Sequence, residues 1–253
     1  MSGDGLLTGR RAVVTCADAA VGREIVKRFA DQGAIVAFGG ADGAAGRRLE
    51  AEIREISPES LYIPCDSRSA ESVAEFCDEV NRRFPEIRIL VNSPHSDLSP
   101  GLMESDDETE RELLQVYQHS IVQTQRAFLE KLWAAGHGSV INISSGEVYC
   151  GEFGDAIRTA AYAAVGGMTR VPVIEGSECE VRANEILVAP GAYREEPSPA
   201  PLRVSGGRPD VECAADTAVF LASELSSFIN GVSIRIDGGA SRSLDEAGPF
   251  RAS

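Results

Sequence analysis

The stretch VINISSGEVYCGEFGDAIRTAAYAAVGGMTR, residues 140–170, decides the fold class of this chain because it joins a strand pattern to a helix pattern. Its beginning, Val140 to Ser145, is a β-branched run that is typical of a buried strand. The part from Ala156 to Met168 is dominated by small residues and predicts a helix that packs very closely against its neighbours. A buried strand followed by a helix is the repeating unit of an α/β protein.

The same alternation of short apolar runs and helical patterns extends over the rest of the chain. The six further runs are Ala12–Thr15, Ala34–Phe38, Leu61–Cys65, Ile87–Asn92, Glu185–Ala189 and Val232–Asp237. Continuous apolar strands separated by helices predict a parallel sheet that is covered on both faces. We therefore expect one Rossmann-like, doubly wound α/β domain with a seven-stranded parallel sheet over residues 1–253, with residues 1–8 and 241–253 as terminal tails.

Composition excludes several classes of function. The chain has 39 acidic and 24 basic residues and a formal charge of −15, which argues against nucleic acid or an anionic membrane as a partner. It contains no apolar run of about 18 residues and no signal-peptide pattern at its start, so we expect a cytoplasmic protein. The six cysteines include no C-x-x-C pair and no histidine at ligand spacing, so no metal site is predicted.

Several segments resemble the short-chain dehydrogenase/reductase family. These segments are ILVNSPH (residues 89–95), Pro190-Gly191, and FINGVSIRIDGG (residues 228–239). The resemblance covers about residues 9–240 and implies a Rossmann fold, NAD(P)-dependent oxidoreductase chemistry and assembly through two surfaces. One expected surface is a four-helix bundle built from the helices around residues 108–134 and around Arg158, and the other is formed by the last helix and strand.

The catalytic residues of this family are replaced in the chain. In the family a Tyr lies thirteen residues after a Ser and a Lys four residues after the Tyr; counting from Ser145 without a gap gives Arg158 and Tyr162. A rival alignment keeps Tyr162 as the catalytic Tyr, but it needs a four-residue insertion and places Gly166 at the Lys position. The fourth position, an Asn on the preceding long helix, falls on Val116. Without a neighbouring cation to lower its pKa from about 10, a Tyr is a poor base at neutral pH.

The glycine-rich phosphate loop of the family, T-G-x-x-x-G-x-G, is also degenerate. Residues 15–22 read TCADAAVG, so Cys16 and Ala20 replace two of the three glycines and Gly22 alone is kept. Glycine allows unusual dihedral angles and a close approach of the backbone to phosphate oxygens. Asp18 adds a carboxylate near the expected phosphates. We therefore expect pyrophosphate to bind poorly and no cofactor to be used.

The other cofactor positions are only partly kept. In the family an acidic residue at the end of the second strand binds the ribose of the nucleotide. In this chain that position is occupied by Phe38 or Gly39, and Asp42 could reach the ribose from the next turn. Weak candidates for contact with a nucleotide are the residues that still match the family, namely Thr15, Gly22, Asp66, Asn92, Pro190 and Gly191.

These losses favour a catalytically inactive subunit of a heteromeric, NAD-dependent, hydroxyacyl-type dehydrogenase, assembled with an active family member as a tetramer or a dimer of dimers. Two alternatives stay open: a redox-free lyase or isomerase that uses the emptied nucleotide pocket, and a divergent NAD(P)-dependent oxidoreductase that uses Tyr162. Structural roles are also expected, since Ser145 could cap the following turn and Arg158 could pair with Glu147, Glu152 or Asp155.

Pro172 lies within the expected span of the helix that carries Arg158 and Tyr162. An interior proline removes a helical hydrogen bond and costs about 3 kcal/mol. We therefore expect this helix to be shorter or bent.

Overall fold

The computed structural model describes residues 5–84, 86–151, 155–189 and 210–239. They form a seven-stranded parallel sheet with the strand order β3-β2-β1-β4-β5-β6-β7. The strands are β1 (Arg11–Val14), β2 (Ile35–Gly40), β3 (Leu61–Pro64), β4 (Ile87–Asn92), β5 (His137–Ser145), β6 (Glu180–Val188) and β7 (Ser233–Ile236). The predicted Rossmann-like fold class is confirmed.

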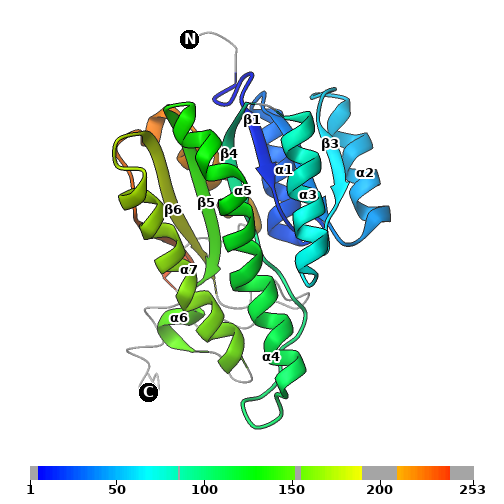
Figure 1. Ribbon diagram of the computed structural model, residues 1–253, viewed down its shortest axis with the longest axis vertical. Coiled ribbons are helices and arrows are strands. Elements are labelled where there is room, and N and C mark those ends of the chain that lie inside the picture. Colours follow the sequence, from blue (N-terminus) through cyan, green and yellow to red (C-terminus); the bar gives the residue numbers. More distant parts are fainter. Residues whose placement is uncertain (1–4, 85, 152–154, 190–209, 240–253) are drawn as a thin grey trace, which may run out of the picture.

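Helices cover both faces of the sheet. One face carries α3 (Ala70–Arg83), α5 (Ser120–Ala134) and α7 (Ala156–Glu175), which lie in front of the strands in Figure 1. The other face packs against α1 (Ala20–Asp31), α2 (Gly43–Arg54) and α8 (Asp210–Ala222). Shorter segments are α4 (Asp107–Leu114), the π-helical turn η1 (Gln115–His119), α6 (Glu147–Cys150) and the 3-10 turn η2 (Glu224–Ser226).

Alternate residues of each central strand supply the two hydrophobic cores. In β1, Val14 belongs to the core beneath α1 and α8, whereas its neighbour Val13 belongs to the core beneath α3 and α5. Phe38 and Ala37 of β2 divide in the same way. All four side chains are fully buried. Burial of a large apolar side chain contributes roughly 1.5–3 kcal/mol, so strands that are apolar on both faces are stable only between two helical layers.

The strand order reverses between β1 and β4, which pair directly. In open α/β sheets, ligands bind in the crevice outside the carboxyl ends of the strands at such a reversal. The ends of these two strands are tied together, because the Ser93 amide donates to Thr15 Oγ1 at 3.0 Å. The continuous helical segment α4–η1–α5 extends past the same edge of the sheet (Figure 1).

Pro172 does not shorten α7, contrary to that part of the expectation, since the helix continues to Glu175. The proline frees the carbonyl of Met168 one turn earlier. That carbonyl accepts a hydrogen bond from Gln125 Nε2 of α5 at 3.2 Å. A side chain of the neighbouring helix therefore replaces the lost backbone donor.

In the part of the chain that is described, no helix has the length and apolar character needed to cross a membrane.

Candidate functional site

A cleft of about 570 Å³ opens at the carboxyl ends of β1 to β4. It is lined by residues of the β1–α1 turn, the β2–α2 and β3–α3 connections and the segment after β4, namely Cys16, Asp18, Ala19, Ala20, Ala41, Asp42, Cys65, Asp66, Ser67, Arg68, His95, Ser96, Asp97, Leu98 and Glu112. The cleft lies at the strand-order reversal, which is the usual place for a nucleotide in a doubly wound sheet.

The β1–α1 turn follows the path of a glycine turn although glycine is missing. Cys16 has a φ of 50°, which is the left-handed conformation that glycine adopts most readily. Its side chain is 7 % exposed and lies beside the hydroxyls of Thr15 and Ser67. Burial raises the pKa of the Cys16 thiol to about 11, so the thiol is neutral at pH 7. The conformation therefore survives the substitution.

Gly22, the one family glycine that is kept, has a steric role in the same turn. A Cβ atom at this position would lie 2.4 Å from the carbonyl oxygen of Cys16. The first turn of α1 can therefore pack directly against the β1–α1 turn only with glycine at this position.

The amino terminus of α1 faces the cleft. Its N-cap residue is Ala19, which offers no side-chain acceptor, and the first turn contains no acidic residue. The first backbone amides of a helix have no intrahelical acceptor and favour an anion such as a phosphate group. These amides, together with the glycine-like path at Cys16, fit the pyrophosphate of a dinucleotide.

Two carboxylates in the cleft lining are held by backbone amides. Asp18 Oδ2 accepts from the amides of Ala41 and Asp42 at 2.7 and 3.0 Å. Asp42 Oδ1 accepts from the amides of Ala44 and Ala45 at 2.8 and 3.0 Å, and these bonds lower the pKa of Asp42. Asp42 is thus the N-cap of α2, which accounts for its position after the second strand.

The residues assigned to the ribose position at the end of β2 do not face the cleft. Phe38 is fully buried in the core beneath α1. A Cβ atom on Gly39 would lie 2.7 Å from Cys65 Cβ, inside the opposite core. The assignment of this position to Phe38 or Gly39 is therefore wrong. The residue of β2 that faces the cleft lining is Gly40, because a Cβ atom added there would point at Asp18.

Asp66 lines the cleft, but its carboxylate binds Arg68 through two bonds. Arg68 Nε and Nη2 donate to its two oxygens at 2.9 Å each. The guanidinium lowers the pKa of Asp66, so the carboxylate is ionised at neutral pH. The pair supplies a charged wall at the adenine end of the cleft.

Asn92 belongs to a buried polar chain that connects the sheet with two helices. Its Oδ1 accepts from Thr124 of α5 at 2.7 Å, and its Nδ2 donates to Asn142 at 2.8 Å. Asn142 in turn donates to Thr169 of α7 at 2.9 Å. These contacts fix α5 and α7 relative to β4 and β5, so Asn92 has a structural role. Pro190 and Gly191 lie outside the described residues.

The family's Ser position is at the end of β5. Ser145 is 1 % exposed, and its Oγ accepts from the amide of Glu147 at 3.3 Å, so it caps the following turn. Val116, at the helix Asn position, is fully buried within η1. Its backbone carbonyl accepts a hydrogen bond from the Ser120 hydroxyl at 2.6 Å.

Arg158, at the family's catalytic Tyr position, belongs to a buried ionic cluster. Its Nη2 binds Asp155, its Nε lies 3.8 Å from Glu147 Oε2, and Asp155 also accepts from the Ser99 hydroxyl. The side chains of Arg158, Asp155 and Glu147 are only 12 %, 0 % and 4 % exposed. Burial alone would lower the pKa of Arg158, but the two carboxylates outweigh this effect and raise it. The expected pairing of Arg158 with nearby carboxylates is confirmed.

Tyr162 packs in a small apolar cluster between α7 and η1. It is 2 % exposed, and its ring lies 4.7 Å from the ring of Tyr117 with an interplanar angle of 59°. Tyr117 accepts from the Ser96 amide at 3.0 Å, and burial raises its pKa to about 12. Tyr117 is therefore a neutral phenol at pH 7. Sequence reasoning missed Tyr117, because no motif marks it and its position facing α7 depends on the π-helical turn.

In the described cluster, the gapless count places a guanidinium rather than a phenol at the family's catalytic Tyr position. A guanidinium does not lose its proton in proteins. The tyrosine that follows the Asn position, Tyr117, is neutral and buried. The described site thus combines an open cleft at the strand-order reversal with a closed ionic cluster at the positions that the gapless count assigns to the family's acid/base residues.

The strand order and the cleft define an open, doubly wound α/β protein with a cleft at its topological switch point. A family model described as enoyl-(acyl carrier protein) reductase matches residues 16–241. The chain belongs to the short-chain dehydrogenase/reductase family.

Named relatives support this assignment. The chain is 30 % identical over 244 residues to 2,5-dichloro-2,5-cyclohexadiene-1,4-diol dehydrogenase of Sphingobium indicum, with 92 % of this chain and 96 % of the relative covered. It is 27 % identical to 3-oxoacyl-[acyl-carrier-protein] reductase of Chlamydia trachomatis, with 93 % of this chain and 98 % of the relative covered. A short chain dehydrogenase from Mycobacterium smegmatis has the same fold, with a TM-score of 0.78 and 24 % sequence identity. The match covers 94 % of this chain and 95 % of the other.

The expectation that no cofactor is used is wrong. The relatives are named as dehydrogenases and a reductase, classes that in this family transfer hydride to or from a nicotinamide nucleotide. The structural reason is that glycine was needed at position 16 for its dihedral angle, and Cys16 adopts that angle. Counting lost glycines overstated the damage to the phosphate loop.

Proposed function

We propose that this protein binds a nicotinamide dinucleotide but does not itself transfer hydride, and that it serves as the partner subunit of an active family member. The observation that carries this proposal is the sealed ionic cluster of Arg158 with Asp155 and Glu147. It fills the position from which a Tyr would act on a substrate hydroxyl or carbonyl.

The cleft supports the binding part of the proposal. The amino terminus of α1 would hold the pyrophosphate, and Asp66 with Arg68 would bound the adenine end. A bound nicotinamide nucleotide would supply hydride chemistry. Of the residues that the gapless count places at the family's acid/base positions, Arg158 stays protonated and Val116 is apolar, so neither would take up the proton that accompanies hydride transfer.

The outer face of α5 and α7 supports the partner-subunit part. An apolar groove of about 680 Å³ lies between these helices and includes Leu129, Trp133, Met168 and Val171. Val171 is 49 % exposed, and Trp133 Nε1 is buried without a hydrogen-bond partner among the described residues. This is the face expected to form a four-helix bundle with a second subunit, and an active family member with a matching face would bury it.

The test combines assembly, binding and turnover. The protein is co-expressed with an active family member from the same genome and analysed by native mass spectrometry, while the isolated chain is titrated calorimetrically with NAD⁺ and assayed with alcohols. Mixed oligomers, measurable NAD⁺ binding and no turnover by the isolated chain are expected. Homo-oligomers alone, with turnover by this chain, would overturn the proposal and favour an oxidoreductase that uses Tyr162.

A further inference from the structure

The end of β2 lacks the side chain that would face the ribose of a dinucleotide. The strand ends at Gly40, and a Cβ atom built there would lie 2.8 Å from both Cγ and Oδ1 of Asp18. The space beside Gly40 is thus filled by the carboxylate of a residue from the β1–α1 turn. An acidic side chain could not be added at position 40 while Asp18 keeps this position.

The Asp18 carboxylate is held in a fixed orientation. Its Oδ2 accepts from two consecutive amides, those of Ala41 and Asp42, at 2.7 and 3.0 Å. Among the residues that the structure describes, no donor is within hydrogen-bond reach of Oδ1, and Asp18 is part of the cleft lining. One oxygen is therefore available to accept a hydrogen bond from a ligand in the cleft.

The chemistry of this oxygen distinguishes two ligands. A carboxylate accepts hydrogen bonds from the hydroxyls of an unmodified ribose, and it repels a 2′-phosphate. The basic residues nearby are Arg68, which lines the cleft but is paired with Asp66, and Arg47 and Arg48 of α2. The two arginines of α2 add to the stronger effect of the Ala45 and Ala44 amides in lowering the pKa of Asp42. Asp42 thus already faces both arginines, which leaves Asp18 as the carboxylate fixed directly beside Gly40.

We propose that Asp18 selects the cofactor by taking over, from the β1–α1 turn, the ribose-binding role of an acidic residue at the end of β2. The protein then prefers NAD⁺ and NADH over their 2′-phosphorylated forms. This inference rests on the proposed nucleotide binding, and it assigns a role to a residue that sequence reasoning treated as an obstacle to phosphate.

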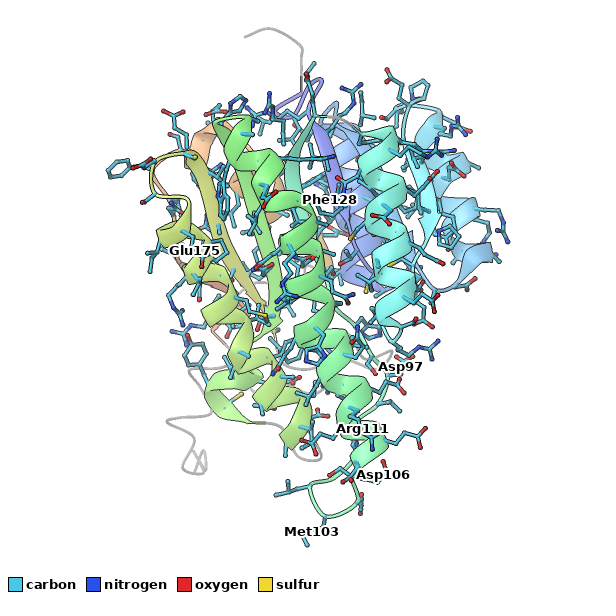
Figure 2. The ribbon with its side chains drawn as sticks, viewed as in Figure 1. Asp97, Met103, Asp106, Arg111, Phe128 and Glu175 are labelled. Atoms are coloured by element: carbon cyan, nitrogen blue, oxygen red, sulfur yellow. The ribbon has the colours of Figure 1, made fainter. Side chains whose placement is uncertain are left out.

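The first experiment measures the dissociation constants of NAD⁺ and NADP⁺ by calorimetry for the full chain and for Asp18→Asn. Asparagine would turn its oxygen toward the two amides and its amino group toward the ligand. Affinity for NAD⁺ should fall about tenfold or more, and the preference over NADP⁺ should shrink or reverse. Asp106→Asn is the matched control, because the exposed Asp106 carboxylate also accepts from a backbone amide, that of Thr109 at 2.8 Å, but lies near α4 outside the cleft lining (Figure 2). The control should leave the ratio of the two constants within about twofold of the wild type.

A side-chain exchange separates cofactor selection from simple damage to the turn. Asp18→Ala should lose the preference for NAD⁺, and the double variant Asp18→Ala with Gly40→Asp should regain it, since the carboxylate returns to the same space from β2. Circular dichroism verifies that each variant is folded. If the wild type binds neither dinucleotide, the proposed function fails and this inference with it. If the wild type binds NAD⁺ and Asp18→Asn behaves like Asp106→Asn, this inference alone is overturned.

Discussion

Replacing Arg158 by methionine tests whether the cluster on α7 is a structural ion pair. Methionine keeps an unbranched stem but leaves Asp155 and Glu147 without their cation at side-chain exposures of 0 % and 4 %. Removal of one member of a buried pair costs about 3–5 kcal/mol, because the remaining charge stays buried. In a chain of this size, each kcal/mol of lost stability lowers the melting temperature by about 2–4 °C, so the melting temperature of the variant should fall by roughly 6–20 °C.

The assay is thermal and urea unfolding of Arg158→Met beside Arg82→Met. Arg82 binds Glu79 at 2.7 Å, but its side chain is 67 % exposed, and an exposed pair of this kind is worth less than about 1 kcal/mol. The control should therefore melt close to the wild type. Equal, small losses in both variants would refute the structural assignment and make Arg158 a residue available to a ligand.

The sign of the pH dependence gives an independent check of the same variant. Without the guanidinium, burial of the two remaining carboxyl groups favours their neutral, protonated forms in the folded state. Stability is then lost as the pH rises, because the folded state binds more protons than the unfolded state. The difference in the free energy of unfolding between Arg158→Met and the wild type should accordingly become smaller on acidification from about pH 7 to about pH 5. A difference that widens over this range would contradict the argument.

Two further outcomes are expected. The double variant Arg158→Tyr, Tyr162→Lys restores the family spacing but should form no detectable NADH with secondary alcohols. The reason is that buried Asp155 remains beside the new Tyr and opposes its ionisation. Turnover by this variant would show that the cluster does not block catalysis. Gln125→Leu should lower the free energy of unfolding by about 1–3 kcal/mol in urea titrations, since the Met168 carbonyl beside the proline loses its donor, and an unchanged midpoint would show that this carbonyl finds another partner.

The fold could be predicted because every strand carries an apolar run that only a doubly covered sheet can bury. The first residues of the strands were harder to predict from the sequence. β5 begins at His137 rather than Val140, and β6 begins at Glu180 rather than Glu185. These additional residues pair with each other through the backbone, with His137 opposite Glu180. Such pairing does not depend on hydrophobic side chains, so an apolar pattern does not reveal it.

Counting residues assigns positions to the catalytic half of the family's site, and this assignment stays a prediction, whereas the conformation of the cleft could not be obtained by counting. Ser145, Arg158 and Val116 follow from spacing alone, and the structure places all three in buried positions around the end of β5 and the helices beside it. The state of the phosphate loop depends instead on a dihedral angle of Cys16. The left-handed conformation costs a non-glycine residue about 1–2 kcal/mol, which a folded domain can offset, so the loss of a glycine does not by itself abolish the turn.

Both halves of the site involve the segment after β4, but most of the contacts that hold them are different, so one half can change while the other is kept. The cleft depends on the β1–α1 turn and on amides after β2, through Cys16 and Asp18. The ionic cluster depends on α7 and the segment after β4, through Arg158, Asp155 and Ser99. A ligand that binds only the folded chain adds about 2.7 kcal/mol of stability at a concentration of about 100 times its dissociation constant. A bound dinucleotide would therefore stabilise the folded subunit whether or not that subunit performs chemistry, and this contribution gives a physical reason to retain the cleft independently of catalysis.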